Sequence, residues 1–402
     1  MKALFVSRHN NDYDSMAPVA DGWVAASAEN SAIFYFSTPE LRWRDDYRTA
    51  MLRENGRIGL VDVWDIAGTG AAGDWLDSQW AGADANHRFR RKVVQMATEA
   101  LVMPRYRAGL LRLLDREKPD IIAFDWYSPP ARRKRFGYFG YQEILSWAKA
   151  HAVPIVSLPH GLVLYDRPQE KPSKAEAYYH TSFIQSEERR QISERNGDDL
   201  SKIFVSGSPR YDPSWVERVA RRLAVKDEPE SDRVNIVFFG KKQVYDFDFA
   251  AQNAWLAHLA AHPRVQLTIQ PHPRGQKDKA FAALAGLSNV VIDAKTPASA
   301  LIDRAQIVST LTSSVMVEAV VRGREILYPK FVNTVLTRFE EKGACISLER
   351  MEDTHLAIDA FIAGERVPRE NYEAFLKETV FGGRGPDTIA RICTRMAEIA
   401  GE

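Results

Sequence analysis

The sequence predicts an α/β protein made of two doubly wound domains that face a central cleft, with helices at the C-terminal end. Three observations favour this architecture. The chain has 402 residues, which is too long for one ordinary hydrophobic core. Short apolar runs alternate with segments of helical period, as in proteins with parallel sheets. A charged, proline-containing stretch at 225–233 lacks apolar periodicity and divides this alternation into two halves.

Apolar runs bounded by polar or turn-forming residues predict the strands. In the first half these are Lys2–Val6, Ala32–Phe36, Ile58–Val63, Ile121–Phe124, Pro154–Leu158 and Ile203–Val205. In the second half they are Val234–Phe239, Val265–Ile269, Val290–Ile292, Gln306–Ser309 and Glu325–Tyr328. Because helical segments separate the strands, we expect both sheets to be parallel.

Apolar residues at helical spacing predict a long helix near Arg91–Glu117 and another at Tyr141–His151. The stretch 68–86, rich in Gly, Ala and Asp, predicts a loop. A last helical segment, Asn371–Ile399, is interrupted at Gly382–Pro386 and predicts two helices.

The predicted elements define four segments of the chain. We expect an N-terminal domain at 1–224, a linker at 225–233, a C-terminal domain at 234–370 and a helical tail at 371–402. In open parallel sheets, ligands bind at the carboxyl ends of the strands. The polar motifs described next all follow predicted strands, so one cleft between the domains could collect them.

Composition excludes several classes of protein. Lys and Arg number 54 against 53 Asp and Glu, whereas nucleic-acid binding usually needs a basic excess. Cys345 and Cys393 are far apart and lack metal-ligand spacing, so we expect two reduced thiols. Met1–Ser7 predicts a strand rather than a signal peptide, and no window approaches the roughly 18 apolar residues of a membrane span. We expect a cytoplasmic protein.

A phosphate-binding motif follows a strand of the second half. His272 and Arg274 lie in the sequence Gln-Pro-His-Pro-Arg, directly after Val265–Ile269. The flanking prolines restrict the backbone, so the imidazole is held in one direction at low entropic cost. His272 could hydrogen-bond to a phosphate or protonate it as it leaves, and Arg274 adds a permanent cation. The alternative is a histidine that only satisfies loop backbone.

Hydroxyl-bearing residues precede a helical run about forty residues later. Thr312, Ser313 and Ser314 stand before it, where bare N–H groups and the helix dipole attract anions. Glu318, one turn further, could bind ribose hydroxyls. The alternatives are simple N-capping and a solvated carboxylate.

The strand Val234–Phe239 ends in Gly240, Lys241 and Lys242. Glycine lets a ligand approach the backbone closely, and either lysine could screen a diphosphate. The spacing is not that of a P-loop, and a surface turn is the alternative.

In the first half, His160 follows the strand Pro154–Leu158 and is the candidate general base, against a structural turn histidine. Other polar residues and one glycine near strand ends could line an acceptor or sugar pocket. They are Arg8, His9, Asp125, Gly161 and Arg210.

Two basic clusters remain, at 88–92 and at 132–135, the second with aromatic residues beside it. Such runs are usually solvated. Next to apolar side chains they also suit an anionic membrane surface or a lipid-linked acceptor.

Several of these motifs, in this order, resemble bacterial surface-polysaccharide transferases of the GT-B fold, which has two Rossmann-like domains. The pattern is similar to the CDP-glycerol glycerophosphotransferases, and its His-Pro and Ser-Ser elements are similar to transferases that use CMP-linked ulosonic acids such as Kdo or sialic acid. The motifs are Pro159-His160-Gly161, Val205–Asp212, Gln270–Arg274, Thr312–Ser314 and Tyr328-Pro329.

The resemblance implies a cytidine-nucleotide donor, a base at His160 and donor-binding roles for His272, Ser313 and Ser314. The chain departs from the glycerophosphotransferases at Phe239–Lys242, where those enzymes have a Pro-Thr-Trp-Arg-like ending. Their acidic residue before the serines is also replaced, here by Leu311-Thr312.

From these features we expect a glycosyltransferase of capsule, O-antigen or teichoic-acid-like synthesis. It would move a sugar from a CMP-linked donor, bound by the second domain, to a carbohydrate or lipid-linked acceptor on the first, at the inner face of the cell membrane. His160 would deprotonate the acceptor, Arg274 and the serines would hold the phosphates, and His272 would stabilise the leaving group. We expect metal-independent transfer, with no cofactor beyond the nucleotide donor.

Three alternatives stay open. The first is a CDP-glycerol or polyol phosphotransferase. The second is an epimerase acting on UDP-sugars, which shares the two-domain architecture and also places His and Ser in its cleft. The third is a non-catalytic carbohydrate-binding protein, which would need neither His160 nor His272.

Overall fold

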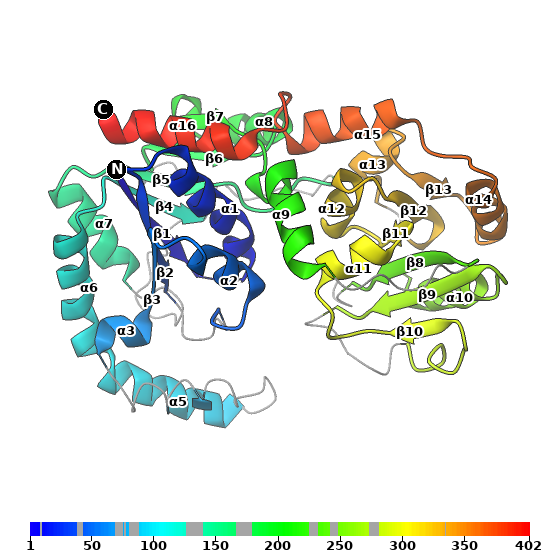
Figure 1. Cartoon of the computed structure of the whole chain (residues 1–402), viewed down its shortest axis with the longest axis horizontal. Helices are drawn as coiled ribbons and strands as arrows, with labels where there is room; N and C mark the ends of the chain where they lie inside the picture. The colour runs from blue at the N-terminus through cyan, green and yellow to red at the C-terminus, as the bar shows by residue number, and fades with distance from the viewer. Residues whose placement is uncertain are drawn as a thin grey trace. The chain divides into compact units, whose positions relative to one another are not determined.

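The computed structural model describes the chain apart from residues 9, 38–42, 69–74, 76–77, 80–87, 126–139, 166–178, 225–231, 242–247, 273–280 and 334. The chain forms two compact units, each built on a β-sheet with helices around it (Figure 1). Unit 1 comprises Met1–Gly161, Lys171–Asp212 and Asp387–Glu402. Unit 2 comprises Leu162–Glu170 and Pro213–Pro386.

The sheet of unit 1 has seven parallel strands in the order β3-β2-β1-β4-β5-β6-β7. The strands are β1 Lys2–Ser7, β2 Ser31–Phe36, β3 Ile58–Asp62, β4 Ile121–Asp125, β5 Ile155–Leu158, β6 Thr181–Ile184 and β7 Ile203–Val205. The strand order reverses its direction between β1 and β4. In doubly wound sheets, the carboxyl ends of the strands at such a reversal form the ligand-binding edge.

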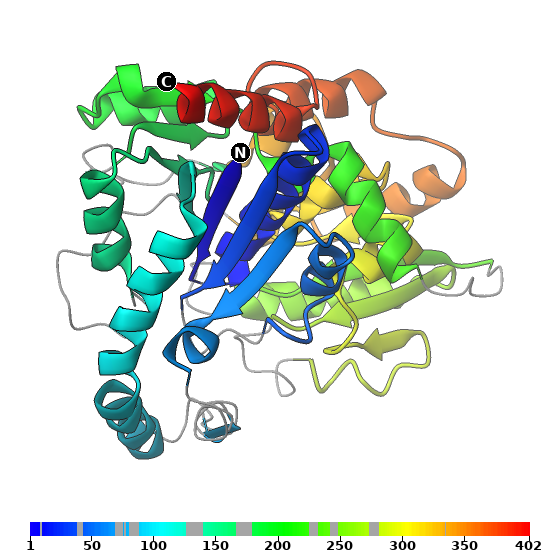
Figure 2. The same cartoon turned by 60° about the vertical axis from the view of Figure 1, so that its left-hand side comes forward.

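Helices lie on both faces of this sheet. They are α1 Asn10–Ala26, α2 Tyr47–Arg53, α3 Val63–Ala67, α5 Arg88–Leu101, α6 Met103–Glu117, α7 Tyr141–Ala150, α8 Glu187–Arg195 and α16 Thr388–Gly401, with 3₁₀ turns η2 Leu200–Lys202 and η3 Pro209–Tyr211. Apolar residues of α3, α5, α6 and α7 form one buried cluster with β1, β2 and β4. Helices α1 and α16 pack on one another and contact strands of the same sheet (Figure 2).

The predicted long helix near 91–117 is two helices. Helix α5 ends at Leu101 and α6 begins at Met103, with Pro104 in its first turn. Proline lacks the N–H that would continue the ladder of α5, but it is tolerated in the first turn of a new helix.

The sheet of unit 2 has six parallel strands in the order β10-β9-β8-β11-β12-β13. These are β8 Val234–Phe239, β9 Val265–Gln270, β10 Val290–Ile292, β11 Ile307–Ser309, β12 Glu325–Pro329 and β13 Ile346–Leu348. The helices are α9 Pro213–Leu223, α10 Phe249–Ala260, α11 Ala298–Arg304, α12 Val315–Val321, α13 Arg338–Glu341, α14 Asp353–Ile362 and α15 Arg369–Phe375, with η4 Lys330–Val332 and the π-turn η5 Leu376–Val380. The two predicted doubly wound domains are therefore confirmed.

The boundaries of the units differ from those expected from composition. Helix α9 belongs to unit 2, where Nη2 of Arg322 donates to the carbonyl of Val216 at 3.5 Å. The expected tail is divided, because α15 belongs to unit 2 and α16 to unit 1. Helix α16 is held in unit 1 by Asp212, whose Oδ2 accepts from the backbone N–H of Ile389 at 3.0 Å. Most of the expected linker lies outside the described residues.

Two further findings concern the chain as a whole. Cys345 and Cys393 are free and buried. No helix among the described residues is long and apolar enough to cross a membrane.

Candidate functional site

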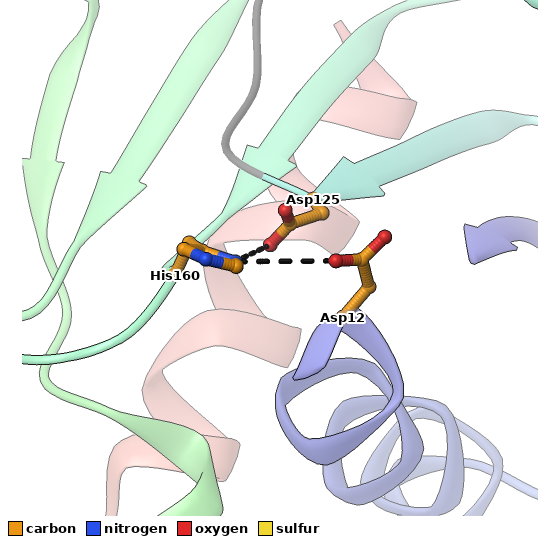
Figure 3. Close-up of side chains that lie close together, drawn as sticks. All are labelled: Asp12, Asp125 and His160. Carbon is orange, nitrogen blue, oxygen red and sulfur yellow. Dashed lines mark hydrogen bonds and ion pairs between the residues drawn. The ribbon is translucent and has the colours of Figure 1, made fainter. Parts of the chain in front are cut away.

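Four polar side chains meet at the carboxyl edge of the unit 1 sheet. Asp125 is the last residue of β4, His160 follows β5, and Arg8 follows β1. Asp12 lies in the first turn of α1, which begins directly after that strand. Strands β1, β4 and β5 are neighbours, so the sheet order itself brings these residues together. Figure 3 shows three of them, with the carboxylates of Asp12 and Asp125 directed toward the imidazole.

The imidazole of His160 is oriented by Asp125. Its Nδ1 lies 2.9 Å from Oδ1 of Asp125. Since a carboxylate can only accept, this hydrogen bond assigns the proton to Nδ1 and leaves Nε2 as the basic nitrogen. The side chain of His160 is 37% exposed and that of Asp125 only 2%. His160 is therefore the member of the pair that a ligand can reach.

Asp12 and Arg8 form the buried floor of the cluster. Oδ1 of Asp12 lies 4.0 Å from Nδ1 of His160, and Oδ2 accepts from the backbone N–H of Arg8 at 3.0 Å. The guanidinium of Arg8 lies 3.7 Å from Asp12 and 3.8 Å from Asp125. One buried cation thus faces two buried carboxylates, which reduces the cost of holding their charges away from water.

This arrangement shifts the proton affinities of two groups. Burial, followed by the charge of Asp125, raises the pKa of Asp12 to about 7 despite the opposing charges of Arg8 and His160. Burial lowers the pKa of His160, but the hydrogen bond and charge of Asp125 together with Asp12 outweigh it, so its pKa is raised. Two titratable groups with raised pKa values therefore lie side by side, as expected of an acid–base site.

The same residues offer ligands for a cation. One atom from each of Asp12, Asp125 and His160 lies within 4.8 Å of the others. Two features favour proton chemistry over metal binding. The guanidinium of Arg8 already supplies a positive charge to both carboxylates, and Nδ1 of His160, the nearest ring atom, carries a proton toward Asp125. A ligand nitrogen must instead present a lone pair.

The first-half candidates are only partly brought together. His160, Asp125 and Arg8 share the cluster. Gly161 follows with φ +66°, and no heavy atom of the described residues lies within 4 Å of the position that its Cβ would take. Nη1 of Arg210 instead pairs with Asp14 at 2.7 Å, which joins η3 to α1. His9 lies outside the described residues.

Sequence reasoning missed Asp12. The sequence feature that could have indicated Asp12 is its position four residues after Arg8, with which it forms an i,i+4 ion pair.

Unit 2 brings three of its predicted motifs close together. A Cβ on Gly240 would lie 3.3 Å from the carbonyl oxygen of Gln270 and 3.4 Å from the backbone nitrogen of His272. Nζ of Lys241 donates to Oγ1 of Thr312 and lies 5.8 Å from the ring centre of Tyr165. The ends of β8, β9 and β11 therefore form one polar edge. Lys242 and Arg274 lie outside the described residues.

The start of α12 provides weaker support for anion binding. Oγ of Ser313 accepts from the backbone N–H of Val315 at 3.4 Å, whereas the side chain of Ser314 makes no capping hydrogen bond. The helix has only seven residues. Glu318 is buried and pairs with Arg322 at 3.0 Å, so its carboxylate is engaged within the unit rather than presented to a ribose.

Solved structures similar to this chain are sugar-nucleotide enzymes. UDP-GlcNAc 2-epimerase from Neisseria meningitidis, bound to UDP-GlcNAc, has 13% sequence identity and a TM-score of 0.57 over 99% of both chains. A putative UDP-N-acetylglucosamine 2-epimerase from Listeria monocytogenes has 12% identity and a TM-score of 0.61 over 99% of this chain and 96% of the other. Arabidopsis thaliana UGT89C1 complexed with UDP has 13% identity and a TM-score of 0.57 over 98% and 99%.

At this identity the likeness shows the fold, which is that of GT-B-like enzymes. No protein-family model matches the sequence, and no curated protein matches it.

The expectation of a cytidine-nucleotide glycosyltransferase is therefore wrong. The similar structures are UDP-GlcNAc 2-epimerases and a UDP-bound plant protein, and they agree better with the epimerase alternative. The error has a physical reason. A His-Pro turn, a lysine and paired hydroxyls recognise phosphates, and every nucleotide-activated sugar carries phosphate. These residues therefore carry no information about the nucleotide base.

Proposed function

We propose that the protein is an epimerase acting on a UDP-linked amino sugar such as UDP-GlcNAc. The observation that carries this proposal is the pairing of a reachable imidazole, His160, with the buried carboxylates of Asp125 and Asp12. The fold likeness to UDP-GlcNAc 2-epimerases supports the choice of substrate. The cluster supports the choice of reaction, because inversion of C2 by proton transfer requires a base that removes its proton.

When C2 of such a sugar loses its proton, the electron pair of the C2–H bond must form a new bond, since no adjacent carbonyl can accept it as an enolate. A neighbouring leaving group is therefore required. Departure of UDP meets this requirement. The C2–H pair forms a C1=C2 double bond, while the C1–O pair leaves with the diphosphate. Re-addition of UDP to C1, with protonation of C2 on the opposite face, gives the epimer. Atoms and electrons balance without an oxidant or reductant, so the proposal requires no redox cofactor.

In this proposal His160 acts through Nε2. Asp125 holds the ring in the tautomer whose Nε2 accepts a proton, and its negative charge stabilises the imidazolium that forms. Asp12, whose pKa is about 7, adds a second negative charge 4.0 Å from Nδ1 when it is ionised. Asp12 and Asp125 are too buried to touch a sugar, so they are positioning residues and His160 is the catalytic one. The four-residue cluster would remove the proton from one face of C2. Protonation of C2 on the opposite face needs a second group that donates a proton.

The polar edge of unit 2 would bind the nucleotide. Among the described cations of this edge, Lys241 contacts Thr312 of the predicted phosphate motif, so it would stabilise negative charge on a diphosphate. A side chain at Gly240 would press on the backbone of Gln270 and His272, so the glycine lets the ends of β8 and β9 lie close together. His272 would donate a hydrogen bond to a phosphate oxygen from the adjacent strand end.

The test is isotope exchange at C2. The full-length protein is incubated with UDP-GlcNAc in D₂O and followed by proton NMR. We expect the C2 proton signal to disappear and a second anomeric signal to appear, with free UDP as a minor species. A protein that leaves the C2 proton in place contradicts the proposal. Complete release of UDP without an epimer would instead indicate hydrolysis or glycosyl transfer.

A further inference from the structure

Helix α5 exposes an apolar stripe that the core of unit 1 does not use. Its inner side is buried through Val94 and Thr98, and Val94 belongs to the main cluster of the unit. On the outer side, Val93 is 49% exposed and Met96 is 62% exposed. Both views show α5 at the end of α6, beyond the sheet (Figures 1 and 2). Among the described residues, none covers this stripe.

The same region carries a marked excess of positive charge. Between residues 88 and 112 the chain has seven cations and one acid, Glu99, whereas the whole chain has 54 against 53. The cations are Arg88, Arg90, Arg91, Lys92, Arg105, Arg107 and Arg112. Lys92 is exposed beside the stripe, and Leu111 of α6 is 40% exposed next to Arg112, which is exposed. Apolar side chains and cations therefore share the outer sides of both helices.

We propose that α5 binds an anionic membrane surface. A helix with apolar residues on its outer side and flanking cations lies in the interfacial plane of a bilayer. There its apolar side chains enter the acyl boundary and its cations meet acidic headgroups. Long basic side chains also keep their charged ends in water while their stems cover apolar surface. Membrane binding of this kind does not depend on the reaction assigned to unit 1.

The charge pattern argues against two other partners. A second copy of this chain would bring the same cations against one another, and like charges across a contact oppose association. A nucleic acid would pair with the cations but would leave Val93 and Met96 without an apolar environment. An anionic bilayer satisfies both kinds of side chain at once.

The experiment is co-sedimentation of the full-length protein with vesicles, either of phosphatidylcholine alone or with about 30% phosphatidylglycerol. We expect binding to the anionic vesicles that weakens as salt is added. Val93→Ser with Met96→Ser should reduce the binding constant about tenfold through lost apolar contact. Lys92→Glu with Arg112→Glu, two exposed cations, should reduce it at least as much.

Matched controls lie in unit 2. Leu356→Ser removes a side chain that is 71% exposed, and Lys295→Glu reverses an exposed charge. Both should bind vesicles as the unaltered protein does, and circular dichroism would verify that all variants are folded. The proposal is overturned if anionic vesicles bind no better than neutral ones at low salt, or if the two double variants bind as the controls do. It is also overturned if the two double variants only convert a dimer to a monomer in sedimentation velocity.

Discussion

Nδ1 of His160 lies 2.9 Å from Oδ1 of Asp125; Asp125 ends β4, and His160 lies two residues after the end of the adjacent parallel strand β5. Their Cα positions are set by the register of β4 and β5, in which Asp125 faces Leu158. The pair therefore forms without the separate ordering of two loops. This rigid support allows one carboxylate to select the tautomer of the base.

The first prediction concerns His160 itself. Replacement by Asn keeps a polar side chain of similar reach but removes the basic nitrogen. We expect C2 exchange to fall by at least about a hundredfold, the usual contribution of a general base. The melting temperature should change little, since the ring is 37% exposed. Exchange at a near-normal rate in a folded His160→Asn variant would remove this residue from the mechanism.

The second prediction concerns the pH dependence of Asp125→Asn. The raised pKa of His160 places the acid limb of the rate profile above the ordinary value of 6.5, because only the neutral ring accepts a proton. In the variant the negative charge of Asp125 is lost and the amide oxygen is a weaker acceptor, so burial then lowers the pKa of His160. The acid limb should move to lower pH while the maximal rate falls about a hundredfold. An unshifted limb would show that Asp125 does not control the base.

A third prediction follows from the buried carboxyl of Asp12. Its pKa is about 7 in the folded protein, against an ordinary value of 3.8. The folded state therefore holds a proton that the unfolded state has lost, so stability falls as pH rises from about 4 to 7. Asp12→Asn removes this dependence.

The Asp12→Asn variant should be more stable than the unaltered protein by about 4 kcal/mol at pH 8, with little difference near pH 4. Urea unfolding at the two pH values measures this. An equal effect at both pH values would mean that the carboxylate is not protonated in the folded state.

The fourth prediction concerns nucleotide selectivity. A ligand that binds only the folded state stabilises it by mass action, by about 2.7 kcal/mol at one hundred times its dissociation constant. UDP should raise the melting temperature more than CMP, CDP or GDP at equal concentration.

Lys241→Ala should remove most of the shift produced by UDP, because the ammonium is the cation predicted to meet the diphosphate. His160→Asn is the matched control and should retain the shift. A larger shift with CDP than with UDP would contradict the proposed substrate.

The fifth prediction tests the packing of α1 on α16. A Cβ on Gly22 would lie 2.2 Å from Cγ2 of Ile389, far inside van der Waals contact. Gly22→Ala should lower the free energy of unfolding by about 1–3 kcal/mol, although alanine favours the helix. Adding Ile389→Ala should recover part of this loss. The matched control is Gly56→Ala, where the described part of the chain places no heavy atom within 4 Å of the new Cβ. Purely additive effects of the two changes would contradict the contact.

Much of the fold could be predicted because strand signals are local. Continuous apolar runs identified five strands of unit 2, and the structure contains all of them. The strands that were missed, β6 and β13, have four and three residues, and Ser or Thr occupies half of β6. These hydroxyl residues are buried because of the layers around the sheet, which no local pattern records.

The residues of the site were predictable only in part. His160, Asp125 and Arg8 were found because each stands near the end of an apolar run. Asp12 was missed because its burial depends on how α1 packs after β1. The position of Glu318 near the start of its helix predicts a ligand-binding role, but in the structure its carboxylate pairs with Arg322, four residues further on.

Local apolar pattern and turn chemistry specify the alternation of strands and helices, and with it the edge of each sheet where polar residues gather. Both can be followed along the chain without knowledge of its packing. The order of the strands cannot be followed along the chain in this way. It is the adjacency of β1, β4 and β5 that brings residues 8, 125 and 160 together and buries Asp12 beneath them. The return of α16 to unit 1 is likewise a property of the folded chain. Strand order and burial arise from the packing of distant segments, because only contact between those segments removes their apolar surfaces from water.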